Sequence, residues 1–227
     1  MSDNLGVYNQ ITWPGVGDAD DCWVIATFWS LVAGGVFSRD QLPTVRAFRE
    51  AAGVPDRAGK ADGGNNAQIL RALRKLAPKS GAYSYVGGLS GFGTALAKGY
   101  VASVSVLSSL LPKYLQFGFQ GTHQISVILQ GGKYYVMNPL AQEGSALLEI
   151  SAADLQRAAA GLIGDGKVHA VMIKIGVRSY STGAPLLGPT VLQPPSYRTS
   201  YIDGFEAARF YMARHKRQPS GEPSGLL

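Results

Sequence analysis

The chain has 227 residues, a formal net charge of +6 and a single cysteine. This length suits one globular domain with an appendage, and one cysteine excludes an intrachain disulfide framework, which makes a reducing compartment the simplest origin. No apolar stretch reaches the roughly 18 residues of a membrane span, and the first residues lack the basic and apolar regions of a signal peptide. We therefore expect no membrane span, no signal peptide and synthesis in the cytoplasm.

The first half of the sequence predicts helices. The acidic residues Asp18, Asp20 and Asp21 can cap a helix, because carboxylates accept from the unpaired amides of a first turn. The apolar run that follows ends at a Gly-Gly pair and fits a helix enclosed on most sides. The predicted helical segments are residues 22–33, 44–52, 66–76 and 94–98. A short strand at 83–86 precedes a glycine-rich run, residues 87–93, which lacks a phosphate-binding pattern and predicts a loop.

From residue 101 onward the apolar pattern changes to the alternation typical of strands. The predicted strands are residues 101–106, 123–130, 133–137 and 168–175. Gly131 and Gly132 join two of them and predict a hairpin. Ser151 can cap a helix over residues 152–160. Helices followed by an antiparallel sheet predict an α+β fold.

The composition changes after residue 177. Residues 178–227 are rich in proline and glycine and hold six Lys or Arg against three acidic residues, a balance of +3. A short amphipathic helix is expected at about residues 202–214. We divide the chain into a domain, residues 1–177, and an extended basic arm, residues 178–227, which we expect to dock onto protein partners. A solvated tail is the alternative interpretation.

Cys22 is the candidate nucleophile, because it opens the first long helix and helix N-terminal amides favour the thiolate. His123 opens a strand, and Asn138 ends the partner strand 138 − 123 = 15 residues later, where its carbonyl oxygen can accept from the imidazole and fix its orientation. The order matches the Cys-His-Asn version of the catalytic triad. Each residue alone has a commoner explanation, since a lone cysteine is usually buried, a lone histidine structural and Asn-Pro a turn.

Other kinds of site have weaker support. The three histidines, His123, His169 and His215, are far apart in sequence and offer no zinc-binding spacing with the single cysteine. The basic run at 214–217 has only Tyr211 as a nearby aromatic residue, so nucleic acid is an unexpected partner. We expect no metal and no cofactor, a structural His169 and a solvated His215.

Three segments together resemble a papain-like cysteine peptidase of the C39-like type, the group of bacteriocin-processing peptidases and related phage and bacterial domains. Asp21-Cys22 before an apolar helix resembles the nucleophile motif of that family, residues 123–128 its histidine strand and residues 135–139 its Asn-Pro motif. The resemblance covers roughly residues 5–177. It implies a papain-like α+β fold, in which the nucleophile helix packs on an antiparallel sheet.

The resemblance also implies chemistry. Cys22 would attack a carbonyl carbon, His123 would transfer the proton, Asn138 would orient His123, and no cofactor would take part. The family's oxyanion-hole glutamine lies a few residues before the nucleophile, and the nearest glutamine here is Gln10, with Asp18 a poorer substitute because a carboxylate repels an oxyanion. The implied substrate is a peptide or peptidoglycan, and the implied setting is a phage virion, with the tail preferred.

Two departures from the family pattern leave other functions open. Trp23 follows Cys22 where the family commonly has glycine, so we expect a crowded cleft near the sulfur, and Gln10 is twelve positions upstream of Cys22. The alternative is a catalytically silent structural or adaptor protein of a phage virion that keeps the peptidase fold. A nucleic-acid-binding accessory protein is a third and less favoured hypothesis.

Overall fold

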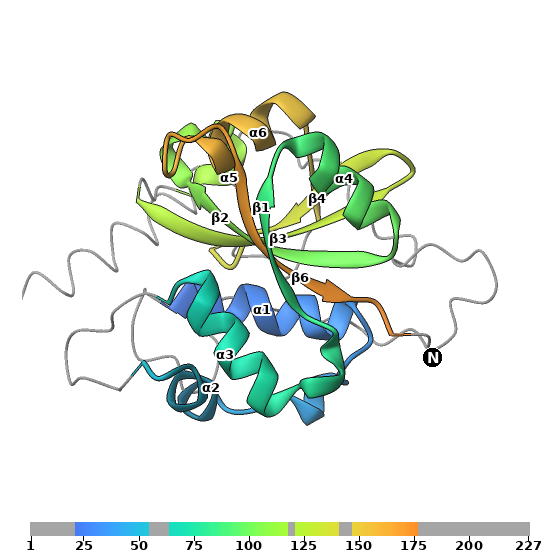
Figure 1. Cartoon of the computed structure of the whole chain (residues 1–227). Coiled ribbons are helices and arrows are strands. Elements are labelled where there is room, and N and C mark those ends of the chain that lie inside the picture. The colour runs from blue at the N-terminus through green and yellow to red at the C-terminus, as the bar shows by residue number, and fades with distance from the viewer. Residues whose placement is uncertain (1–20, 55–63, 118–120, 141–146, 177–227) are drawn as a thin grey trace, which may run out of the picture.

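An antiparallel β-sheet separates two layers of helices (Figure 1). The computed structural model describes residues 21–54, 64–117, 121–140 and 147–176. Within these ranges the six strands are ordered β1-β6-β2-β3-β4-β5 and every neighbouring pair is antiparallel. Their bounds are β1 Tyr83–Gly87, β2 Tyr100–Leu107, β3 Thr122–Gln130, β4 Lys133–Met137, β5 Leu148–Ile150 and β6 Val168–Lys174. The α+β prediction is confirmed.

The α-helices of the described ranges fall into two groups, one on each face of the sheet. Three helices lie below the sheet in Figure 1, and they are α1 Cys22–Ala33, α2 Val45–Ala52 and α3 Asn66–Leu76. Three lie above it, and they are α4 Leu89–Ala97, α5 Lys113–Gln116 and α6 Ala152–Ala160. Each group packs its apolar side chains against its own face, so the sheet is buried between two hydrophobic cores.

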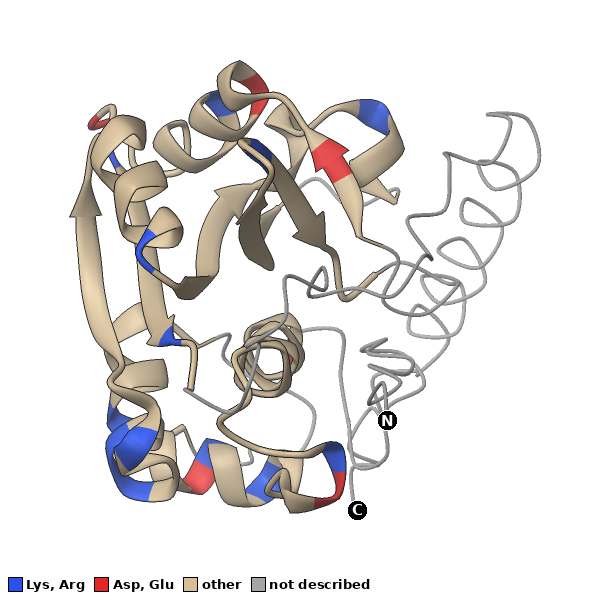
Figure 2. Cartoon of the chain, turned by 90° about the vertical axis from the view of Figure 1, so that its right-hand side faces the viewer, with Lys and Arg blue, Asp and Glu red and all other residues tan. Residues whose placement is uncertain are grey.

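Helix α1 is enclosed, as its apolar sequence predicted. The sheet covers one side of it, and α2 and α3 cover the other. It contains no charged residue, and Figure 2 shows it end-on near the centre in the colour of uncharged residues, while Lys and Arg gather on the outer helices. A helix that is apolar all round is stable only when it is buried on all sides, and this is the position of α1.

Short-range signals set most element boundaries correctly. Thr44 caps α2 by accepting from the Ala47 amide at 3.1 Å, and Ser151 caps α6 by accepting from the Asp154 amide at 3.0 Å. In the β3–β4 hairpin, Gly131 has a φ of 57° and Gly132 a φ of 79°, a left-handed pair that side chains other than glycine rarely adopt. The predicted hairpin is confirmed.

The prediction of a loop over residues 87–93 is wrong, because α4 begins at Leu89 inside this glycine-rich run. A Cβ atom on Gly91 would lie 2.7 Å from the Tyr85 hydroxyl, and one on Gly93 would collide with the Tyr134 hydroxyl. The glycines therefore provide space for tyrosines of β1 and β4 to approach the helix. Their low helix propensity is outweighed by this packing.

Candidate active site

Cys22 is the first residue of α1 and the only one in the helix that is not buried. The residues that follow it anchor the helix in the core, while Cys22 itself is only partly buried at the first turn. The amides of this turn have no intrahelical partner and carry partial positive charge, which favours a thiolate. Cys22 therefore combines access with a favourable electrostatic position.

Asp21, directly before the cysteine, occupies the N-cap position, but its carboxylate makes no capping hydrogen bond with the first turn. It forms an ion pair with the guanidinium of Arg49 on α2, and both residues are only 2% exposed. The expectation that the Asp21 side chain caps the helix is therefore wrong. Because Arg49 compensates its charge, the carboxylate opposes the ionisation of the neighbouring thiol less than an isolated anion would.

Trp23, directly after the cysteine, points into the core. It is 1% exposed, and its ring lies 5.6 Å from that of Phe48 on α2. A Cβ atom on Gly64 would collide with the indole, so Gly64 provides room for it. The indole therefore belongs to the helical core, and the expectation that it crowds a cleft near the sulfur is wrong.

His123 and Asn138 are joined by a hydrogen bond of 2.8 Å between His123 Nε2 and Asn138 Oδ1. The hairpin register explains why they meet. Ser126 pairs with Met137, so Ile125 lies opposite Asn138, and His123 is the diagonal neighbour on the same face. Both residues are 2% exposed. The contact predicted from their spacing is present.

The Asn138 amide is held in one orientation. Its Nδ2 donates to the Leu115 carbonyl at 2.8 Å, and its Oδ1 accepts from the Leu140 amide at 2.9 Å. With Oδ1 fixed as an acceptor, His123 Nε2 must be the donor, so the network assigns the proton of the neutral imidazole to Nε2. The lone pair is then on Nδ1, which makes Nδ1 the basic nitrogen.

Burial lowers the pKa of His123 from 6.5 to about 4, because an imidazolium would lose its hydration, although the Asn138 hydrogen bond partly opposes this effect. At neutral pH the imidazole is therefore uncharged. It is available as a base but holds no permanent positive charge.

Serine side chains tie α1 to β3. Ser126 Oγ donates to the Ala26 carbonyl at 2.6 Å and accepts from Ser30 Oγ at 3.1 Å. All of these atoms are buried. This contact places the middle of α1 directly over the middle of β3.

The neighbours of Gly34 give the direction of α1. At its C-terminal end, a Cβ atom on Gly34 would lie 3.6 Å from Ile173 Cγ2 on β6, and Ile173 pairs with Val101 near the beginning of β2. Since β2 and β3 are antiparallel, this is the end of the sheet where β3 finishes. Helix α1 therefore begins at the end where β3 starts, which puts Cys22 at the same end of the sheet as His123.

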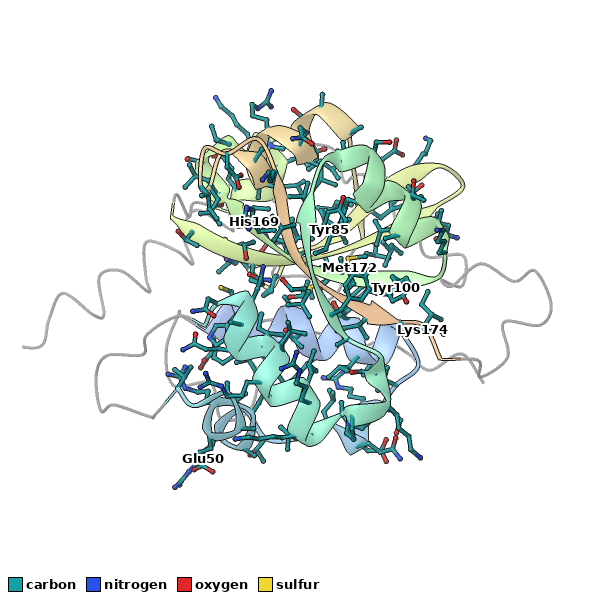
Figure 3. All side chains as sticks on the ribbon, in the orientation of Figure 1. Glu50, Tyr85, Tyr100, His169, Met172 and Lys174 are labelled. Atoms are coloured by element: carbon teal, nitrogen blue, oxygen red, sulfur yellow. The ribbon has the colours of Figure 1, made fainter. Side chains whose placement is uncertain are left out.

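The remaining sequence-predicted residues are distributed as follows. Gln10, Asp18, Asp20, His215 and the basic arm lie outside the described residues. His169 is on β6, next to the strand of Tyr85 (Figure 3), and its Nε2 lies 2.9 Å from Asp165 Oδ2. The hydrogen bond from His169 holds the pKa of Asp165 below its ordinary value. This pair fastens the turn before β6, a structural role of the kind expected for His169.

Sequence reasoning missed two residues that support the site. Leu115 supplies the carbonyl that orients Asn138, and it lies on α5, a four-residue helix too short to show a periodic pattern. Arg49 had a readable signal, because it follows Phe48 on the apolar side of α2, where a cation is buried only with a partner. That partner is Asp21.

Within the described ranges, no group of three or more His, Cys, Asp or Glu side chains is arranged to hold a metal ion. No helix in the same part of the chain has the length and apolar character needed to cross a membrane.

No protein-family model matches the sequence, and no curated protein does. Among solved structures, the crystal structure of a Bacillus anthracis protein assigned as a C39-like peptidase matches with a TM-score of 0.53 and 11% sequence identity. The match covers 75% of this chain and 94% of that chain. At this identity it shows the fold, which is the papain-like α+β fold of a C39-like peptidase.

Proposed function

We propose that this chain is a cysteine peptidase or amidase in which Cys22 is the nucleophile, His123 the base and Asn138 the residue that orients His123. The observation that carries the proposal is the hydrogen bond between His123 Nε2 and Asn138 Oδ1, with the amide held in one orientation by its other two contacts. A histidine held in this way presents Nδ1 as the basic nitrogen. The peptidase assignment of the fold neighbour supports the same reaction class.

The proposed reaction has two halves. The thiol proton of Cys22 passes to His123 Nδ1 as the sulfur attacks a substrate carbonyl, and the tetrahedral intermediate expels an amine that takes this proton from His123. Water then attacks the thioester, giving its proton to Nδ1, and the proton returns to the sulfur as the acid product leaves. Asn138 holds the ring so that Nδ1 faces the reacting atoms throughout.

The low pKa of His123 keeps the imidazole neutral, so in this proposal it acts as a general base and not as one half of an ion pair. An ion pair that exists before substrate binds would need the imidazolium, which burial disfavours. The thiol therefore loses its proton mainly during the attack, and the helix amides beside Cys22 stabilise the charge that develops on the sulfur.

The sulfur and the imidazole meet, in this proposal, beyond the first residue of β3. By strand alternation His123 shares the sheet face of Ile125, while Ser126 faces α1. The residues therefore cannot meet through the sheet. Cys22, at the first turn of α1 and partly exposed, is at the end where such a meeting is possible.

We propose Gln10 as the side-chain donor of the oxyanion hole, together with the backbone amide of Cys22. The substrate would be a peptide, with peptidoglycan stem or cross-bridge peptides as the specific class, and the setting a phage virion, with the basic arm 178–227 as the docking segment. The substrate class and the virion setting rest on the family resemblance alone.

The second candidate function is a structural or adaptor protein that keeps the fold without turnover. The burial of His123 favours it, because a base with a pKa of about 4 takes up a proton less readily than one near 7. The two functions predict different chemistry at the sulfur.

The test is the rate at which iodoacetamide alkylates the full-length protein between pH 5 and 9, and Cys22 is the only possible thiol target. We expect rapid alkylation at pH 7 that falls about 10-fold or more in the His123→Ala variant. The His169→Ala variant, which removes a histidine with a structural partner, is the control and should alkylate at the original rate. An alkylation profile centred near pH 8.5, as for an ordinary thiol, and unchanged by His123→Ala, would support the silent protein.

A further inference from the structure

A buried chain of polar side chains connects the neighbours of the two proposed catalytic residues. Gln124, next to His123, donates through Nε2 to Ser103 Oγ on β2 at 3.0 Å. Ser103 Oγ lies 3.4 Å from Thr27 Oγ1 on α1, and Thr27 Oγ1 donates to the carbonyl of Trp23 at 2.7 Å. The chain therefore runs from the residue after the base to the residue after the nucleophile.

Counting protons gives every bond in the chain a direction. The single hydroxyl proton of Thr27 is used at the Trp23 carbonyl, so Ser103 must donate to Thr27. The oxygen of Ser103 then accepts from Gln124. Each hydroxyl donates once and accepts once. The three bonds therefore run in one direction, from Gln124 on β3 to the Trp23 carbonyl on α1, and none of these protons is shared between two acceptors.

The Gln124 amide, where this series of hydrogen bonds begins on β3, is also held by other side chains. Ser105 Oγ donates to Gln124 Oε1 at 2.9 Å, which orients the amide so that Nε2 faces Ser103. Asn66, the first residue of α3, brings its Oδ1 within 3.2 Å of Ser105 Oγ and 3.4 Å of Gln124 Nε2. The amide of Gln124 therefore has little freedom to rotate.

These polar groups lie inside the core. Gln124 is 3% exposed, and Ser103 and Thr27 are 0% exposed. A buried polar group without a partner costs about 1–3 kcal/mol, so a sliding motion of α1 on the sheet is penalised as soon as it breaks one bond. Apolar contacts lack this directionality, because they tolerate small shifts between the surfaces.

We propose that Gln124, Ser103 and Thr27 are positioning residues that set where Cys22 stands relative to His123. The inference rests on the proposed function of these two residues. The series joins the first turn of α1 to the start of β3 through contacts of 3.0, 3.4 and 2.7 Å, and a displacement of about 1 Å between reacting groups can cost roughly 10²-fold in rate.

The test compares variants of Thr27 in the iodoacetamide assay on the full chain. Thr27→Val keeps the shape of the side chain but removes the hydroxyl, and Thr27→Ser keeps the hydroxyl. The matched control is Ser30→Ala, since Ser30 is a buried hydroxyl of the same helix whose partner Ser126 keeps its bond to the Ala26 carbonyl. Ser103→Ala interrupts the same series of hydrogen bonds from the sheet side. Urea unfolding confirms the folded state of each variant.

We expect Thr27→Val and Ser103→Ala to slow alkylation at pH 7 by about 10-fold. Adding His123→Ala to either variant should then slow alkylation no further. Thr27→Ser and Ser30→Ala should react at nearly the original rate. If Thr27→Val and Ser103→Ala behave like Ser30→Ala while His123→Ala is still slow, the positioning role is refuted and the proposed function stands. If the unmodified protein itself reacts no faster than its His123→Ala variant, the proposed function is refuted, and the positioning role with it.

Discussion

Replacing Arg49 with methionine should destabilise the protein far more than replacing any exposed arginine. Methionine keeps most of the aliphatic stem of Arg49 but removes the guanidinium, which leaves the Asp21 carboxylate without the cation that compensates its charge. Both residues are 2% exposed, so water cannot take over this role without opening the core. Breaking a buried pair by removing one partner costs about 3–5 kcal/mol, because the remaining charge is left in a medium of low polarity.

This magnitude is large enough to be measured in two ways. For a domain of this size, each kcal/mol lowers the melting temperature by roughly 2–4 °C, so a loss of the stated size corresponds to a decrease of about 6–20 °C. Urea unfolding followed by tryptophan fluorescence gives the free energy directly. Trp23 and Trp29 both lie in the affected core, so their emission reports its opening.

The control is Arg46→Met on the same helix. Arg46 and Glu50 form an ion pair whose side chains are 77% and 60% exposed, and such pairs contribute at most about 1 kcal/mol. The double variant Asp21→Asn with Arg49→Met removes both charges and should recover part of the loss. If Arg49→Met costs no more than Arg46→Met, the Asp21 carboxylate is not buried as the structure shows, and the account of charge compensation beside Cys22 is wrong.

Two further predictions concern other parts of the domain. The pKa of His123 is about 4 in the folded protein and near 6.5 in the unfolded chain. Between these pH values the unfolded chain binds more protons, so the free energy of unfolding is at its full value above pH 6.5 and falls by roughly 3 kcal/mol as the pH approaches 4. Urea unfolding at pH 7 and pH 4.5 should show this loss, and a His123→Gln variant with the same pH dependence would contradict it. Gly132→Ala should cost about 1 kcal/mol or more because its φ of 79° is left-handed, whereas Gly132→Asn should cost less, since asparagine adopts this region more readily. Equal unfolding free energies for the two variants would refute the strain argument.

The features that the sequence predicts correctly depend on neighbouring residues along the chain. Caps such as Thr44 and Ser151, the Gly131-Gly132 turn and the apolar spacing of α1 act within one turn of helix or one hairpin. The contact between His123 and Asn138 belongs to the same class, because a two-residue turn fixes the register of the strands that carry them. Local patterns were therefore sufficient to predict that His123 and Asn138 are in contact.

The features that the sequence predicts wrongly depend on contacts distant in sequence. The glycine-rich run forms a helix because Tyr85 and Tyr134, on two separate strands, occupy the space beside it. Asp21 has the composition of a capping residue, but Arg49, 28 positions away, takes its carboxylate. In each case a tertiary partner outweighs a local preference that is worth about 1 kcal/mol.

Two polar contacts of α1, besides those of Ser126 with its middle, lie near Cys22. On the α2 side, Asp21 is held by Arg49, and on the sheet side Thr27 is held by Ser103. An apolar helix between two apolar surfaces would have little resistance to sliding along its axis, since hydrophobic burial depends on area and not on direction. The two polar contacts act from opposite sides of the helix, within two turns of the cysteine, so they fix the end of α1 that carries the thiol. The core therefore stabilises the fold, while this small set of directional bonds determines where the sulfur lies.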